Sequence, residues 1–186
     1  MLSAIASERL RLRPFAPDDL ANLQALHDDP AVLRFFAARS PEETATILRG
    51  FAERRIRDGV APEALVHNAD GRFLGLAGLA GLPAGMPFSA PAQVLWSLLS
   101  EAQGFGYATE IGRASLRHGF EVLDHPEIAA YCVATNAASE AVIKRLGFRR
   151  DVEFHHPMVD AATHPHLVRH RLHRLAREDW RRAGGA

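Results

Sequence analysis

The chain has 186 residues, of which 47% are hydrophobic and 24% charged, a balance typical of a folded globular protein rather than a disordered one. The 22 basic and 22 acidic residues cancel, so net charge gives no reason to expect nucleic acid or an anionic membrane as a partner. Cys132 is the only cysteine, which excludes an intrachain disulfide and favours a reducing compartment. No run is apolar enough to span a membrane and the first residues lack a signal-peptide pattern, so we expect a cytoplasmic protein. The length of the chain predicts a single domain over 1–186, with a core at about 8–180.

The first forty residues predict a strand and a helix. Leucine alternates with arginine over 8–15, which indicates a strand with one buried face. Asp18 is expected to cap a helix that carries Leu20, Leu23 and Leu26. A break is predicted to begin at Asp29-Pro30, and it contains Phe35 and Phe36.

A second helix has a clear start at 40–43. Ser40 is a typical cap, Pro41 occupies the first helical position and Glu43 the third. We expect this helix to run to Gly59. The residues that it is expected to bury are Ile47, Leu48, Phe51 and Ile56.

A hairpin is predicted next, with strands at 64–67 and 72–79 and a turn at 68–71. Gly75 and Gly78 weaken the second strand and mark a bulge or a close approach of another segment. The stretch 81–92 is rich in glycine, proline and small residues, which predicts a loop. Its length suggests a functional loop, at the edge of a binding pocket.

The stretch 94–120 predicts a strand, a glycine-containing turn and a helix. The strand is expected at 94–99, and the helical spacing of apolar residues runs from 108 to 120. Gly104 and Gly106 let the backbone approach a ligand closely. Because the start of a helix leaves backbone N–H groups unpaired at the positive end of the helix dipole, this turn predicts a site for a phosphate-like anion.

The last third predicts two further strands and a helix. A strand is expected at 128–133, and a short helix at 136–146 closed by Gly147. Asn136 is well placed to be the N-cap of that helix. A late strand is predicted at 167–172.

Two segments resemble one known family. Gln103-x-x-Gly106-x-Ala108, followed by Thr109-Glu110, resembles the Q/R-x-x-G-x-G/A signature of the GNAT family of N-acetyltransferases, and it is most similar to the branch that acetylates protein N-termini, including those of ribosomal proteins. The segment 136–148 resembles the N-x-x-S…K-x-G-F segment of the same branch. The R-L-x-L-R-P-F opening and the ending at 177–180 are also similar to family members, so the resemblance covers most of 8–180.

The resemblance implies an α/β (α+β) fold, with a mixed, mostly antiparallel twisted sheet, a splayed central strand pair and helices on both faces. It implies that the turn cradles the pyrophosphate of acetyl-CoA, the co-substrate, and that the pantetheine arm lies between the strands at 94–99 and 128–133. The coenzyme-binding residues that it implies are Leu98 and Leu99 beside the thioester, Asn136 beside the pantetheine arm, and Gln103, Gly104, Phe105, Gly106, Tyr107, Ala108 and Thr109 in the turn.

For catalysis, the resemblance implies that Ser139 protonates the departing thiolate; the alternative is a local helix role. Members of this branch often carry a glutamate early in the strand before the turn, where this chain has Gln93. An amide cannot accept a proton near neutral pH, so the base is open. The candidate replacements are His67, His155 and His156, because histidine titrates in this range. The alternative for each, and the commoner one for a histidine, is a structural or solvent-exposed role.

The expected function is therefore transfer of an acetyl group from acetyl-CoA to a primary amine, a protein N-terminal α-amine first, by direct attack on the thioester. The alternatives are a small-amine or antibiotic acetyltransferase and a non-catalytic coenzyme A-binding module. Phe35 and Phe36 either line the acceptor site or belong to the core. No metal is expected, because His170 and His173 lie three apart on a strand and point to opposite faces. We expect no nucleic-acid or membrane partner, and a monomer or homodimer.

Overall fold

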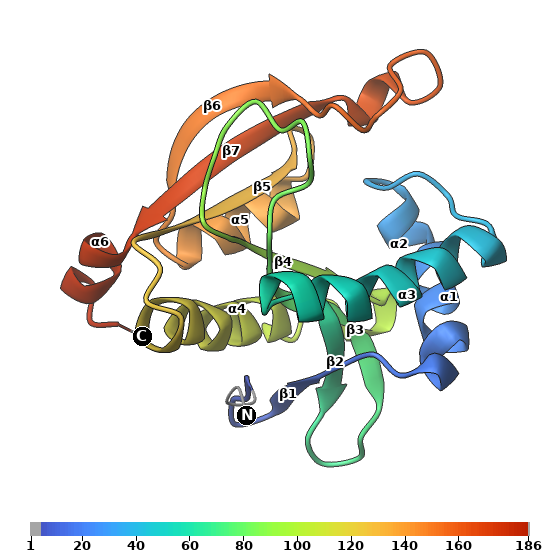
Figure 1. The fold of residues 1–186 in the computed structure, drawn as a ribbon, viewed down its shortest axis with the longest axis horizontal. Helices are drawn as coiled ribbons and strands as arrows, with labels where there is room; N and C mark the ends of the chain where they lie inside the picture. The colour runs from blue at the N-terminus through green and yellow to red at the C-terminus, as the bar shows by residue number, and fades with distance from the viewer. Residues whose placement is uncertain (1–4, 186) are drawn as a thin grey trace.

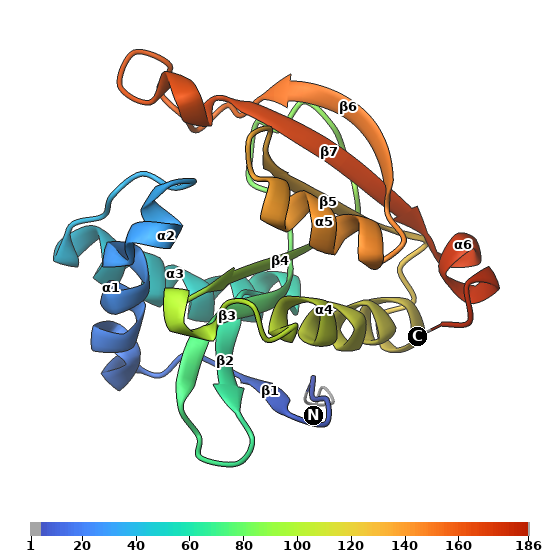
Figure 2. The ribbon, with the colours of Figure 1, turned by 180° about the vertical axis from the view of Figure 1, so that it is seen from behind.

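A computed structural model of the protein describes residues 5–185. Within these residues a seven-stranded sheet has the strand order β1-β2-β3-β4-β5-β7-β6. Every neighbouring pair is antiparallel except β4 and β5, which are parallel. Helices α4 and α5 cover one face of the sheet and α3 covers the other (Figures 1 and 2). The predicted α/β fold with a mostly antiparallel sheet is confirmed.

The strands are β1 Leu10–Arg13, β2 Glu63–His67, β3 Phe73–Ala80, β4 Gln93–Leu98, β5 Glu127–Val133, β6 Arg149–His155 and β7 Arg169–Ala176. The helices are α1 Leu20–Asp28, α2 Pro30–Leu33, α3 Pro41–Asp58, α4 Tyr107–Arg117, α5 Ala137–Arg145 and α6 Arg177–Arg182. Short helical turns precede α1, follow β4, extend α4 and precede β7.

Helix α3 follows its sequence signals closely. The Ser40 hydroxyl accepts a hydrogen bond from the Glu43 N–H, and the Glu43 carboxylate accepts one from the Ser40 N–H. Gly59 ends the helix in the left-handed conformation at φ 74°. The expectation that Ile56 is buried was wrong, since its exposed fraction is 87%. Ile47, Leu48 and Phe51 belong to the cluster that packs α3 against α1 and β3, and Ile56 lies outside that cluster.

Two expectations about the start of the chain also need correction. Asp19, rather than Asp18, accepts the N–H of Ala16 and stabilises the entry to α1. The predicted break after α1 contains the short helix α2, because Asp29 accepts the Ala31 N–H at 2.8 Å and so acts as a cap. The same carboxylate accepts the N–H of Ser100 at 2.8 Å, which joins this cap to the segment after β4.

The parallel pair β4 and β5 opens as expected. Their register contains one pair, Gln93 with Ala129, supported by a hydrogen bond from the Ala129 N–H to the Ala92 carbonyl at 3.0 Å. Beyond Gln93 the two strands diverge, while β4 stays paired with β3 along its whole length. This divergence gives the sheet a gap at its centre, and the predicted splayed pair is confirmed.

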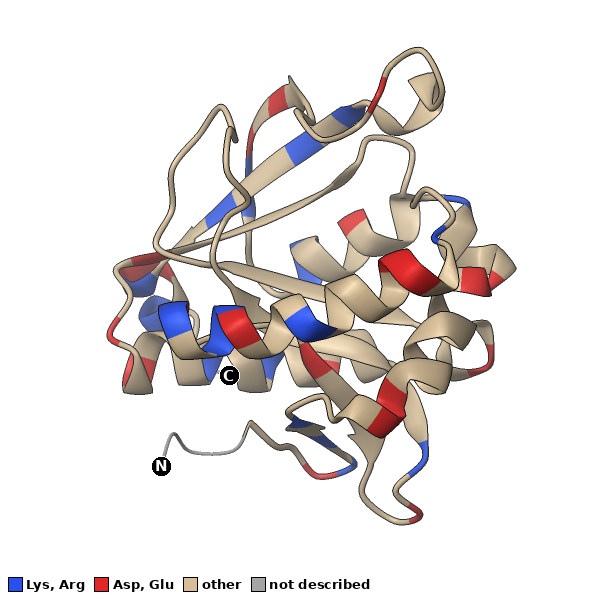
Figure 3. Cartoon of the chain, turned by 45° about the vertical axis from the view of Figure 1, so that its right-hand side comes forward, with Lys and Arg blue, Asp and Glu red and all other residues tan. Residues whose placement is uncertain are grey.

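Strand β6 was not predicted, and β7 is shifted. All residues of β6 except Phe154 are exposed, so the segment lacks the alternation that predicts a strand. Backbone pairing with β7 and a row of arginines on β7 hold it in place (Figure 3). Arg171 forms ion pairs with Glu140 of α5 and Glu153 of β6. These pairs link α5 to the edge of the sheet.

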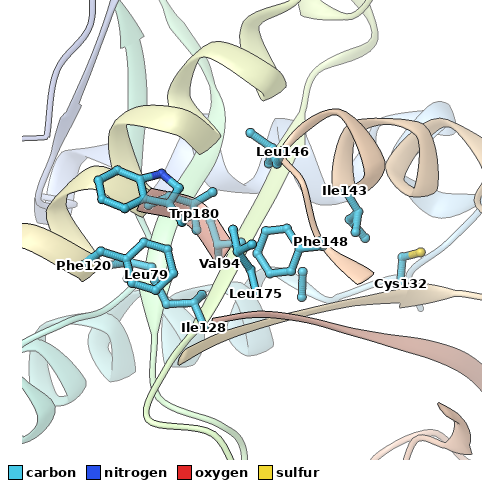
Figure 4. Close-up of a cluster of buried hydrophobic side chains, with 12 residues drawn as sticks. Leu79, Val94, Phe120, Ile128, Cys132, Ile143, Leu146, Phe148, Leu175 and Trp180 are labelled. Carbon is cyan, nitrogen blue, oxygen red and sulfur yellow. The ribbon is translucent and has the colours of Figure 1, made fainter. Parts of the chain in front are cut away.

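The main core fills the space between the sheet and helices α4, α5 and α6 (Figure 4). The rings of Phe120 and Trp180 lie 5.1 Å apart at one end of this cluster, and Cys132 lies at the other end (Figure 4). The opposite face of β5, β7 and β6 is covered by the loop 81–92, where Phe88 packs against Tyr131 and Phe154. This loop therefore covers the sheet.

Candidate active site

The turn between β4 and α4 presents successive backbone N–H groups without a partner. Gly104 and Gly106 have φ values of 86° and 80°, in the left-handed region that glycine adopts without strain. Among the hydrogen bonds within 5–185, none uses an N–H of 104–109; the first helical bond runs from the Glu110 N–H to the Gly106 carbonyl at 3.0 Å. These donors and the positive end of the α4 dipole form a site for an anion such as a phosphate.

A residue that the sequence analysis missed holds this turn in place. Arg9 donates to the carboxylate of Glu110 at 2.7 Å and to the carbonyl of Phe105 at 3.1 Å. Its guanidinium also lies 4.8 Å from the ring centre of Tyr107. Burial opposes ionisation of Glu110, but hydrogen bonds from Ser7 and Arg9 hold its pKa below the usual value. The N-terminal segment thus fixes the entry to α4.

A cavity of about 1360 Å³ extends from this turn, past the opening between β4 and β5, to α1 and α2. Its volume exceeds the range of about 300–1,000 Å³ usual for one small ligand, which leaves room for a long coenzyme and an acceptor. The sequence-predicted site residues that line it are Gln93, Leu98, Gln103, Gly104, Gly106, Tyr107, Ala108, Thr109, Asn136 and Ser139.

Leu99 and one predicted segment lie elsewhere, and Phe105 belongs to the turn through its backbone while its ring points away from the cavity wall. Leu99 packs against the core between α1 and α3. Phe105 has an exposed fraction of 59%, and its ring stacks on Tyr107 at 5.6 Å. The loop 81–92 does not contribute to the cavity wall, so the expectation that it edges a binding pocket was wrong. Its apolar side chains are used to cover the sheet.

At the start of α5, Asn136 caps the helix and Ser139 faces the cavity. The Asn136 side-chain oxygen accepts the Ser139 N–H at 3.0 Å, which confirms the cap interpretation. The Ser139 hydroxyl forms no hydrogen bond with any other described residue and is therefore free to bind a ligand in the cavity. Gln103 donates to the carbonyl of Leu98 at 3.0 Å, which ties the turn to the end of β4.

Gln93 occupies the point where β4 and β5 part. Its side chain is buried, and its amide nitrogen donates to the carbonyl of Gly81 at 3.1 Å. The phenol of Tyr131 lies beside it: burial raises the pKa of Tyr131, and the Gln93 side chain partly offsets the rise. The amide thus serves to anchor the loop that follows β3.

Cys132 lies on β5 across the opening from β4 and also lines the cavity. Burial raises the pKa of its thiol to about 11, with a smaller contribution from the carboxylate of Glu140. The thiol therefore stays protonated at neutral pH and forms part of an uncharged wall.

The histidines proposed as bases from sequence are not in the cavity. His67, His155 and His156 are absent from its wall, whereas His27 and His170 line it. No local signal in the sequence distinguishes these two, because both depend on contacts made by distant elements. Among residues 5–185, no group of three or more histidine, cysteine or carboxylate side chains is arranged to hold a metal ion.

A parallel strand pair that opens beside an anion-binding helix start, with a free hydroxyl on the cavity wall, defines a site suited to a long ligand with a phosphate-like group. The comparison with known families agrees. The model of the acetyltransferase (GNAT) domain matches residues 9–149. The chain therefore belongs to the GNAT family and is an N-acetyltransferase.

Solved structures share this fold. A GNAT-family acetyltransferase from Bacillus anthracis superposes with a TM-score of 0.75 at 19% identity, over 95% of this chain and 99% of that one. A ribosomal-protein alanine acetyltransferase from Vibrio fischeri gives 0.74 at 19% identity, over 96% and 98%. Mycobacterium smegmatis RimJ, in complex with CoA-disulfide, gives 0.70 at 21% identity, over 94% and 89%. No helix within residues 5–185 has both the length and the apolar character needed to cross a bilayer.

Proposed function

We propose that the protein transfers the acetyl group of acetyl-CoA to the α-amine of a protein N-terminus, by direct attack of the amine on the thioester. The observation that carries this proposal is the distribution of charge along the cavity. Among the described residues of its wall, the carboxylates are Glu8 and Glu110. Both lie beside the turn at 103–109 between β4 and α4, here called the coenzyme turn. The opposite end contains apolar side chains, one cation and a histidine whose pKa is lowered by burial: Leu26, Val32, Phe35, Phe36, Arg39 and His27.

The end of the cavity opposite the turn has no carboxylate on its wall, which disfavours acceptors that carry several positive charges. A polyamine or an aminoglycoside would bring additional ammonium groups close to Arg39, with no anion on the wall to pair with them. Arg39 itself pairs with Glu43 at 3.6 Å, but Glu43 lies outside the cavity wall. A peptide terminus brings one amine and an apolar or acidic side chain, which matches this end. The name of the Vibrio fischeri neighbour supports the same class of acceptor.

The acidity of the acceptor also supports an α-amine. A peptide α-amine has a pKa near 7.7–8.0, so roughly a tenth to a fifth is neutral at pH 7, whereas a lysine amine with a pKa near 10.4 is neutral in only about one molecule in 2,500. Gln93 supplies no carboxylate to remove the excess proton of an ammonium group. An acceptor that is already partly neutral depends least on a strong base.

The coenzyme has a matching path along the cavity. The unpaired N–H groups of 104–109 are suited to its pyrophosphate. Because β4 is paired with β3 on one side only beyond Gln93, its remaining backbone donors near Leu98 face the opening, where they are suited to polarise the thioester carbonyl. Ser139, on the α5 side, is then placed to protonate the sulfur.

The proposal is tested by intact-mass analysis after incubation with acetyl-CoA. We expect acetylation of a peptide with a free α-amine, and at least tenfold slower acetylation of the same peptide with a blocked terminus and an internal lysine. Spermidine and an aminoglycoside are the small-amine comparators. Faster acetylation of either comparator, or of the internal lysine, would contradict the assignment of the acceptor.

Ser139→Ala is expected to lower kcat by about 100-fold with little change in acetyl-CoA affinity, because a general acid acts mainly in the transition state. Alanine favours the helix, so the fold should not suffer. Ser139→Thr keeps a hydroxyl and serves as the control, with partial recovery of kcat. A wild-type kcat in Ser139→Ala would leave Ser139 only its contact with Asn136.

A further inference from the structure

We propose that His170 is the general base of the acetyl transfer, and that its Nε2 atom takes the proton of the attacking amine. The inference deepens the proposed function and rests on it for the identity of the amine, although the same geometry would serve any primary amine in the cavity. It assigns to His170 the removal of the amine proton, which the amide of Gln93 cannot perform.

The first observation is where His170 lies. It is the register partner of Val133 on β5, has an exposed fraction of 8%, and lines the cavity. Direct partners in an antiparallel pair point to the same face, so His170 shares the face of Val133 and Tyr131, which is the face opposite α4 and α5.

The second observation is the relation of His170 to Ser139. Ser139 belongs to α5, which covers the other face of the same strands (Figure 2). An ion pair between Glu140 and Arg171, the neighbours of Ser139 and His170 in the chain, holds the two elements together. Both residues line the cavity, Ser139 from α5 and His170 from the opposite face of β5 and β7. An acid and a base can thus act from opposite faces of the sheet, as required when the amine enters from one side and the thiolate leaves toward the other.

The third observation is the tautomer of His170. Its Nδ1 atom lies 3.3 Å from the carbonyl oxygen of Val168, which can only accept a hydrogen bond. Nδ1 therefore carries the proton, and Nε2 carries the lone pair. No hydrogen bond among residues 5–185 uses Nε2, and Nε2 is not among the buried atoms left without a partner, so it is open to the cavity.

The surroundings keep this imidazole neutral. Burial lowers the pKa of His170 to about 4, against a smaller rise caused by the Val168 carbonyl, and His156 lowers it further. The titratable groups that face the ring are His156, which follows β6, at 4.8 Å and Tyr131 of β5 at 5.9 Å between ring centres. A base this weak can still act once the C–N bond has formed. The nitrogen of the attacking amine then carries a positive charge and is far more acidic than a free ammonium group, so a weakly basic imidazole can take its proton.

The step balances without any additional reagent. The lone pair of the neutral amine attacks the thioester carbon and forms the C–N bond. One N–H proton passes to Nε2 of His170, the C–S bond breaks, and its electron pair leaves on sulfur. The thiolate takes a proton from the Ser139 hydroxyl, and the proton on His170 returns through solvent to the serine oxygen. The products are an amide and free coenzyme A.

The decisive variant is His170→Asn. The asparagine amide can still donate to the Val168 carbonyl, as Nδ1 does, but it offers no basic nitrogen at the position of Nε2. We expect kcat/KM for an N-terminal peptide to fall about 100-fold or more, while acetyl-CoA raises the melting temperature as in the wild type. His155→Asn, an exposed change on β6 outside the cavity, is the control and should keep wild-type kcat/KM.

A pH–rate profile with two peptides of different α-amine pKa completes the test. In the wild type the inflection of kcat/KM should move with the peptide, and in His170→Asn the whole curve should lie lower with the same inflection. Wild-type kcat/KM in His170→Asn would overturn the assignment, as would an inflection that stays fixed near neutral pH when the peptide changes. If the wild type acetylates only small amines, the proposed acceptor fails and the same variant is measured with that amine. Absence of transfer to any amine would contradict both proposals.

Discussion

Gly106→Val is expected to weaken acetyl-CoA binding at least 100-fold while the protein stays folded. A Cβ at this position would meet only Arg9, at 3.9 Å, so the protein itself has room for it. Valine would add bulk within the turn whose N–H groups at 104–109 are unpaired, where we expect a phosphate to make direct contact. The left-handed backbone at φ 80° adds strain of about 1–3 kcal/mol for valine, less than the stability of a typical domain.

Gly85→Val is the matched control for this prediction. Gly85 has nearly the same φ, 79°, a Cβ added there would have no atom within 4 Å, and the residue does not line the cavity. Both variants should lose similar stability, but only Gly106→Val should lose the ligand. Calorimetric titration gives the affinity, and thermal unfolding gives an independent check, since a ligand at 100 times its Kd stabilises the folded state by about 2.7 kcal/mol. Equal affinities in the two variants would show that the turn serves the fold alone.

The features of this site that depend on local interactions could be predicted from the sequence. The capping residues of α3 and the glycines of the coenzyme turn act through their own backbone and their near neighbours, so the pattern and the structure agree. The position of Ser139 in the first turn of α5 follows in the same way from the cap at Asn136. The opening between β4 and β5 was expected from the family resemblance, since neither strand alone shows where its partner ends.

The parts that were missed depend on distant contacts. Strand β6 has an exposed edge-strand composition, and only its pairing with β7 defines it. Arg9 and His170 become site residues because β1 brings Arg9 to the turn and β7 brings His170 to the cavity wall. Ten histidines in the sequence give no local reason to select His170. Its selection requires the cavity, the register with β5 and the hydrogen bond to Val168.

Gly75→Ala is expected to be among the most destabilising single changes in the sheet. Gly75 is buried in β3 opposite Leu98 of β4, with φ at 146°. A Cβ there would overlap the carbonyl oxygen of Ser97 and lie 2.8 Å from the Cα of Leu98. Both are backbone atoms of a paired strand, so neither can move without breaking the β3–β4 ladder. We expect a loss of about 3 kcal/mol or more in the free energy of unfolding.

Gly85→Ala separates the steric clash from backbone strain, because position 85 also has a positive φ but open space around a Cβ. The measurement is urea unfolding, in which a lower midpoint at an unchanged m-value reports lost stability. Since β4 carries Leu98 on the cavity wall, any Gly75→Ala protein that still folds should also bind acetyl-CoA more weakly, whereas Gly85→Ala should bind it normally. A Gly75→Ala protein within about 1 kcal/mol of the wild type would show that β4 can shift away from β3. In that case the close contact between β3 and β4 would not determine the position of β4 beside the opening between β4 and β5.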